Sequence, residues 1–167
     1  MSDPSLLSKF QSSFQELAAS AAELNQVSDQ LTKSVAELDS AIMSLSLGVV
    51  CWVDVGEPYG SDDEWSDQLG YEKINGKWGL AIRVLDHPES RVDNQWLFAD
   101  APRDLRVKAV DGIPKLLDAL GAQVTATKNQ IAAKVEGTKQ LEAALAPIRK
   151  YTLKELAGGK HPMKGSK

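Results

Sequence analysis

The chain has 167 residues, of which 43% are hydrophobic and 25% charged, a composition typical of folded soluble proteins. Its apolar runs are too short to span a membrane, and its first residues lack the order of a signal peptide, so we expect a cytoplasmic protein without membrane association. Cys51 is the single cysteine, which excludes a disulfide framework. Residues 1–100 carry a net charge of −11 and residues 101–167 a net charge of +7, so the two halves should attract each other or a charged partner.

Residues 4–47 are predicted to form one long amphipathic helix. Asp3 and Pro4 suit a helix start, and Gly48 suits a helix end. Leucine or phenylalanine recurs every seven residues, at Phe10, Leu17, Leu24, Leu31, Leu38 and Leu45. A companion series, offset by three or four, consists of Leu7, Phe14, Ala21, Ser28, Val35 and Ile42. This is the heptad pattern of a coiled coil, with the second series at the a positions and the first at the d positions. The flanking e and g positions are mostly small and uncharged.

Residues 48–101 are predicted to form a β-rich module of three or four antiparallel strands. Asn75-Gly76 between two alternating segments, 69–74 and 77–85, indicates a hairpin with a two-residue turn. One face of that hairpin is apolar and needs a cover; it consists of Leu69, Tyr71, Trp78, Leu80, Ile82 and Val84. Residues 49–55 read as a further strand, broken at 56–60, and 95–99 as a short fourth strand.

Residues 102–150 are predicted to be helical again. A short helix should run to Val110, with an interruption at 111–114. A longer helix should begin near Pro114 and end at Ala146, before Pro147. Residues 157–167 read as a flexible basic tail.

These elements predict an α+β fold in which the two long helices pair as an antiparallel hairpin, with the small sheet inserted between them. Each apolar stripe must be buried, and the other helix of the same chain is the nearest partner. The predicted helix–helix interface consists of Phe10, Phe14, Leu17, Leu24, Leu31, Val35, Leu38, Ile42, Leu45, Leu117, Leu120, Val124, Ile131, Leu141 and Leu145. The charges also favour this pairing, because residues 1–47 are net negative and residues 115–150 are net positive.

The rival arrangement is a parallel homodimer through the N-terminal helix. Leucine at d with valine or isoleucine at some a positions favours two strands, and the C-terminal stripe is a poorer match for so regular a partner. Both pairings are compatible in a four-helix bundle of two hairpins. We expect a homo-oligomer.

The sequence carries no catalytic signature, so we expect a non-enzymatic protein without metal or cofactor. His87 lies in a predicted turn and His161 in the tail, each without neighbouring ligands. Cys51 lies among β-branched residues and reads as an inert core thiol.

Two charged segments are candidate contact sites. The segment from Asp54 to Asp67 is acidic, and Asp62, Asp63, Glu64 and Trp65 in it are the candidate residues for contact with a protein partner. A cation site there is the alternative, although the calcium-loop pattern is absent. The basic residues Arg149, Lys150, Lys154 and Lys160 are candidates for nucleic-acid contact, which we consider the weaker hypothesis because few aromatic residues accompany them.

The order helix, β-hairpins, helix over the whole chain resembles that of prefoldin subunits. The resemblance implies a chaperone whose coiled-coil arms hold unfolded clients at their distal ends. The residues themselves favour a scaffold or interaction protein, in which a helical hairpin presents a β module to a protein partner. Prefoldin-like holding of clients and nucleic-acid association through the tail are the alternative functions.

Overall fold

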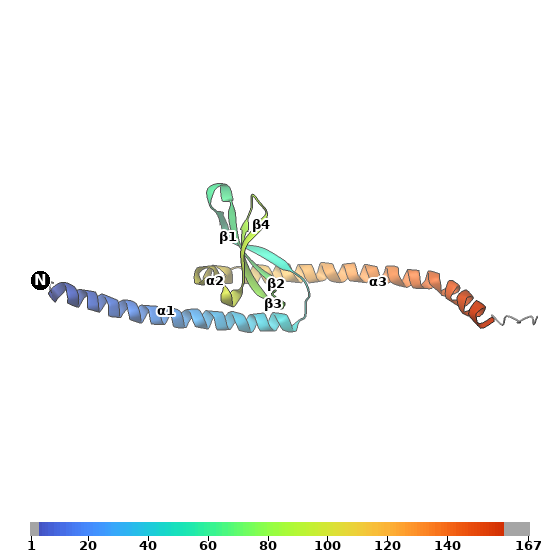
Figure 1. Ribbon diagram of the computed structural model, residues 1–167, viewed down its shortest axis with the longest axis horizontal. Helices are drawn as coiled ribbons and strands as arrows, with labels where there is room; N and C mark the ends of the chain where they lie inside the picture. The colour runs from blue at the N-terminus through green and yellow to red at the C-terminus, as the bar shows by residue number, and fades with distance from the viewer. Residues whose placement is uncertain (1–3, 159–167) are drawn as a thin grey trace, which may run out of the picture. The chain divides into compact units, whose positions relative to one another are not determined.

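The computed structural model describes the backbone of residues 4–158 and the side chains of residues 7–148. The fold is α+β, with a long N-terminal helix, a four-stranded antiparallel sheet and then C-terminal helices (Figure 1). The elements in chain order are α1 (Pro4–Ser44), β1 (Cys51–Tyr59), η1 (Ser61–Asp63), β2 (Trp65–Ile74), β3 (Lys77–Asp86), β4 (Arg91–Leu97), η2 (Phe98–Asp100), α2 (Arg103–Val110) and α3 (Ile113–Gly158). The chain forms two compact units, one up to Gln123 and one from Val124 onward.

The central hairpin has the register that the sequence predicts. Ile74 is opposite Lys77, and Lys73 is opposite Trp78. Asn75 and Gly76 form the turn with φ angles of 49° and 85°, the positive values that a two-residue hairpin turn of this type requires. The strands follow the order β1-β2-β3-β4, so each strand pairs with its neighbour in sequence.

The outer strands differ from their predicted limits. The sequence predicts a break at residues 56–60, but β1 continues to Tyr59. Gly56 adopts a φ of 73°, and the pairing with β2 is irregular between Val55 and Tyr59, so the glycine bends the strand without ending it. β4 begins at Arg91, four residues before the predicted start, and ends before Phe98, which belongs to η2.

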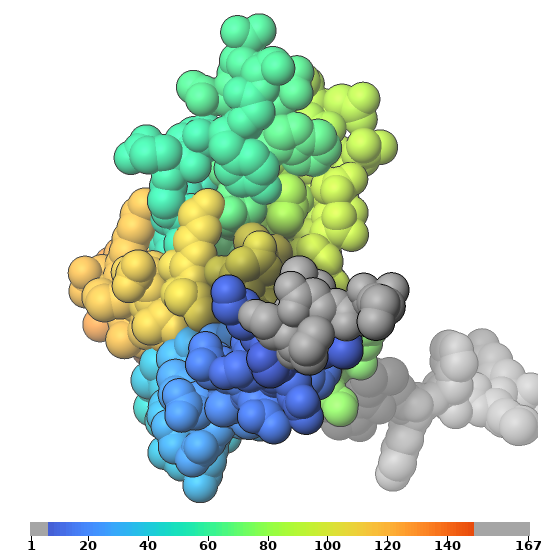
Figure 2. Space-filling model, turned by 90° about the vertical axis from the view of Figure 1, so that its left-hand side faces the viewer, coloured from blue at the N-terminus to red at the C-terminus, as the bar shows by residue number. Residues whose placement is uncertain are grey.

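The core lies against one face of the sheet, which we call the inner face. Its buried residues are Val53, Val55, Leu69, Tyr71, Leu80 and Ile82, which the register places side by side. The cover that this face needs comes from α1, α2 and the first turns of α3, which supply the buried Val35, Ile42, Ala109, Leu116 and Leu120. Figure 2 shows α1 (blue) below α2 (yellow), with the β1–β2 end of the sheet (green) above them.

The connection between α2 and α3 follows the sequence expectation, with the interruption at Asp111-Gly112 and Pro114 in the first turn of α3. Gly112 is required here, because an added Cβ would lie 2.9 Å from Val55 Cγ2. The predicted end of the helix at Ala146 is wrong, since α3 continues through Pro147 to Gly158. A proline removes one backbone hydrogen bond and kinks a helix, and the good helix formers on both sides allow it to continue.

Candidate interaction surfaces

The C-terminal half of α1 is held on the sheet by its heptad a positions. Ser28, Val35 and Ile42 are buried, and they are successive members of the companion series defined by the sequence. We call residues 28–42 the docked segment. It contacts β3 and η2, and Met43 and Leu47 beyond it line a recess with Tyr71 and Trp78. We call the row of a and d positions along α1 the seam. The sheet therefore covers the C-terminal half of this seam.

An aspartate fixes the docked segment to the edge of β3. The backbone N–H of Leu80 donates a 2.9 Å hydrogen bond to Asp39 Oδ1. Leu80 lies just beyond the part of β3 that pairs with β4, so Asp39 satisfies a donor that the sheet leaves free. Burial raises the pKa of Asp39, while the hydrogen bond from Leu80 acts in the opposite direction.

Two arginines of α2 attach this helix to α1. Arg106 Nη1 donates to Thr32 Oγ1 at 2.6 Å, and Arg103 Nη2 donates to Asn25 Oδ1 at 2.6 Å. The contact with Asn25 lies nearest to the N-terminus of α1 among these attachments. Arg103 and Arg106 are three residues apart and so share one face of a short helix, which is a signal that can be read from the sequence.

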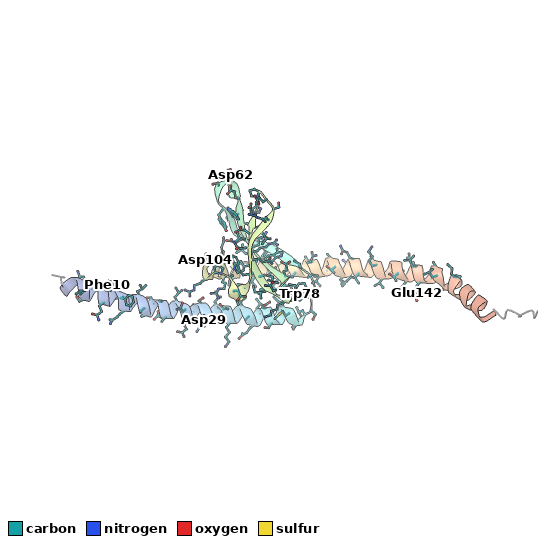
Figure 3. All side chains as sticks on the ribbon, viewed as in Figure 1. Phe10, Asp29, Asp62, Trp78, Asp104 and Glu142 are labelled. Atoms are coloured by element: carbon teal, nitrogen blue, oxygen red, sulfur yellow. The ribbon has the colours of Figure 1, made fainter. Side chains whose placement is uncertain are left out.

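The N-terminal half of α1 is exposed throughout. Every residue from 7 to 27 is exposed, and we call the six a and d positions from Leu7 to Leu24 the free segment. Its large apolar side chains are 53–69% exposed; they are Leu7, Phe10, Phe14, Leu17 and Leu24. The free segment extends beyond the sheet and α2 in Figure 1, and Figure 3 labels Phe10 on it. The heptad seam thus continues from a buried half into an exposed half.

The remaining predicted helix-interface residues fall into three groups. Leu31 and Leu38 are half-buried beside the docked segment, and Leu45 is exposed. In α3, Leu120 is buried in the core of the first unit while Leu117 is exposed. In the second unit, Val124 is half-buried, and the apolar side chains farther along α3 are exposed, namely Ile131, Val135, Leu141, Leu145 and Ile148.

The acidic residues lie at the tip of the β1–β2 hairpin. Asp62 and Asp63 are exposed in η1, and Figure 3 shows Asp62 at the end of the hairpin. Glu64 and Trp65 are half-buried, because Trp65 starts β2 opposite Tyr59. The tip therefore presents charge rather than an exposed tryptophan. Within residues 7–148, no group of three His, Cys, Asp or Glu side chains is arranged to hold a metal ion.

The opposite, outer face of the sheet carries a polar network around Trp52. The Arg83 guanidinium carbon lies 4.1 Å from the centre of the Trp52 ring, a cation–π arrangement. Arg83 Nε donates to Gln68 Oε1 at 2.7 Å, and Gln68 Nε2 donates to Asp54 Oδ1 at 2.7 Å. Gly70 makes room for the indole, since an added Cβ would come within 2.3 Å of it. These side chains satisfy one another and cover the backbone.

An ion pair with a buried carboxylate links α2 to the sheet. Lys108 Nζ and Asp67 Oδ2 are 2.5 Å apart, and the Asp67 side chain is only 6% exposed. Tyr59 Oη donates to the other oxygen of Asp67 at 2.9 Å. Burial, followed by the hydrogen bond to Asp67 and its charge, raises the pKa of Tyr59 to about 12. Through these contacts Lys108 connects α2 to Tyr59 of β1 and Asp67 of β2.

The other residues singled out by sequence add no reactive group. Cys51 is half-buried, and burial raises the pKa of its thiol, which disfavours the reactive thiolate. His87 is exposed. The side chains of Arg149, Lys150, Lys154 and Lys160, and His161, lie outside the described residues, and nucleic-acid contact stays a prediction. Among the helices as far as they are described, none is both long and apolar enough to cross a membrane.

Comparison with known proteins found no matching family model, no matching curated protein and no matching solved structure.

Proposed function

We propose that the protein is a non-enzymatic interaction protein that binds a protein partner through the free segment of α1. The observation that carries the proposal is a single heptad seam with two environments. Its second half is buried on the inner face of the sheet, whereas its first half exposes five large apolar side chains. Contiguous exposed apolar surface of this kind is typical of a binding site.

The energetics of the free segment favour a bound state. Covering a large apolar side chain completely contributes roughly 1.5–3 kcal/mol, so five side chains that are each more than half exposed offer on the order of 5 kcal/mol from one copy. Most of the stability of a helix in a protein comes from packing of its apolar face, so a partner helix would stabilise this part of α1. The β module acts in this proposal as the support that fixes the direction of α1.

The antiparallel hairpin between α1 and α3 belongs to this proposal as one way of covering the seam. It is supported by the exposed apolar residues on α3 beyond Val124 and by the opposite net charges of the two helices. It cannot use Val35 and Ile42, because these side chains face the sheet. Any such pairing would therefore involve the free segment.

The function is tested by capture of partners from the native host, with two variants of equal charge. Phe14→Lys places a cation in the seam, and Ala19→Lys places one on the opposite side of the same helix. We expect a defined protein to be retained by the native chain and by Ala19→Lys, and lost with Phe14→Lys. An unchanged set of partners for all three would contradict the proposal.

A second candidate, client holding as in prefoldin, is favoured by the same exposed Phe10 and Phe14. It predicts that the protein suppresses aggregation of a denatured client at stoichiometric amounts, and that Phe14→Lys weakens this suppression. Binding of one folded partner with no suppression of aggregation would exclude it.

A further inference from the structure

We propose that the partner of the free segment is the free segment of a second copy, paired antiparallel. The inference rests on the proposed function and specifies the partner. The exposed part of the seam has a defined length. Residues 7–24 contain six consecutive a and d positions, all exposed, and Asn25 just beyond them accepts a hydrogen bond from Arg103 of α2. The surface open to a partner therefore ends where α2 begins to cover α1.

In one antiparallel register these six positions complement one another completely. Leu7 faces Leu24 of the second copy, Phe10 faces Ala21, and Phe14 faces Leu17, and each pairing occurs twice about an axis between Gln15 and Glu16. The smallest residue of the seam thus lies opposite a large one. The overlap ends at Leu24, which is also where the free segment ends.

A parallel pairing fits this surface less well. It would place Ala21 opposite Ala21 and Phe10 opposite Phe10, which leaves a void in one layer and crowds another. A parallel seam would also have to end abruptly at Ser28, because Ser28, Val35 and Ile42 are already buried. The full-length parallel coiled coil that the heptads suggest is therefore excluded by the docked segment.

The residues beside the seam suit close antiparallel approach. Positions next to the interface are small or neutral, including Gln11, Ser13, Ala18 and Ser20. Lys9 of one copy lies within one residue of the level of Glu23 of the other, on the same side, which gives two weak attractions. The two Glu16 side chains flank the axis in solvent and offset part of this gain.

The area available is that of a weak, specific dimer. Ten large apolar side chains, four of them phenylalanine, are more than half exposed in two copies. At roughly 100 Å² each they offer about 1,000 Å², close to the lower limit of specific interfaces. We expect a dissociation constant on the order of micromolar.

Sedimentation equilibrium of the full chain measures this constant. We expect the native protein to dimerise, Phe14→Lys to weaken dimerisation by about 100-fold or more, and Ala19→Lys to change it by less than about threefold. Both sites are exposed in the single chain, so tryptophan fluorescence should be the same for all three and confirm that the sheet is intact.

The antiparallel register is tested by exchanging the large and the small residue of one layer. Phe10→Ala and Ala21→Phe should each weaken the dimer by about tenfold, whereas the double variant should return to within about threefold of the native constant. In a parallel dimer residues 10 and 21 are about 16 Å apart along the helix, and the two effects would simply multiply.

The inference would be overturned if the native chain is a strict monomer at several hundred micromolar. It would also be overturned if the effects of Phe10→Ala and Ala21→Phe on dimerisation simply multiply in the double variant. These outcomes are separate from failure of the proposed function. If the protein is monomeric but Phe14→Lys still loses a captured partner, the binding surface stands and only its occupant is different.

Discussion

Truncating one residue in each half of α1 separates the docked segment from the free segment by their effects on stability. Ile42 is 4% exposed against the sheet, and replacing a buried isoleucine by alanine typically costs about 2–5 kcal/mol. We expect Ile42→Ala to lower the free energy of unfolding by about 3 kcal/mol, because the inner face cannot close over the lost side chain. Leu17 is 65% exposed, and Leu17→Ala should change stability by less than about 0.5 kcal/mol in the monomer.

Urea unfolding followed by tryptophan fluorescence measures both values. Trp78 is a suitable reporter because it lines a recess with Met43 at the end of α1, as its position in Figure 3 illustrates. The protein is kept dilute, well below the expected dimer dissociation constant, so that only contacts within one chain contribute. If Leu17→Ala lowers the free energy of unfolding by more than about 1.5 kcal/mol under these conditions, the division of α1 into a docked and a free segment is refuted. Such a loss would show that Leu17 is buried within its own chain, as an intramolecular hairpin requires.

Three further predictions concern contacts of the sheet. Because burial raises the pKa of Asp39, its charged form is disfavoured in the fold, and the cost is present above the folded pKa and disappears as pH falls through it. Asp39→Asn keeps an acceptor for Leu80, so its urea midpoint at pH 7 should equal or exceed the native one; a clear decrease would contradict this. Tyr59 should ionise at about 12 in an ultraviolet titration, and stability should fall as pH rises above the ordinary tyrosine pKa of 10.0. Asp67→Asn should lower that pKa, and an unchanged value would remove Asp67 as a cause. Gly70→Ala should displace Trp52 from Arg83 and cost about 1–3 kcal/mol, visible as a changed near-ultraviolet dichroism of tryptophan; an unaltered spectrum would contradict the close approach.

The sequence predicted the central hairpin well because its signals are local. Asn75-Gly76 determines the turn, and the turn determines which residues face each other across β2 and β3. Alternation of apolar residues then assigns Leu69, Tyr71 and Leu80 to one face. None of these inferences needs a contact with a distant segment.

The partner of α1 could not be predicted in the same way. A heptad pattern indicates which side of a helix is apolar, but it does not say what covers that side. The sequence has two uncovered surfaces, the helix seam and the apolar face of the hairpin, and it predicts that another helix covers the seam. In the structure Val35 and Ile42 are buried with the hairpin face instead. A useful signal was Asp39, a charged residue beside an otherwise neutral seam, which bonds the edge of β3.

Two other differences between the predicted and the observed structure arise because contacts with other segments outweigh the local sequence pattern. Glycine and proline at 56–58 resemble a break, but pairing with β2 continues beyond them through a distortion at Gly56. The sequence predicts that Trp65 is a partner-contact residue of the acidic segment, whereas Trp65 lies at the start of β2 and is half-buried. Burial of one aromatic side chain outweighed the polarity of its neighbours.

Hydrogen exchange of the backbone amides along α1 tests the central claim most directly. In dilute solution we expect strong protection from about residue 28 to residue 42, where the helix lies on the sheet, and rapid exchange from residue 7 to residue 24. At high concentration the second range should become protected as the dimer forms, while the first should not change. Equal protection of both ranges in dilute solution, independent of concentration, would contradict the account.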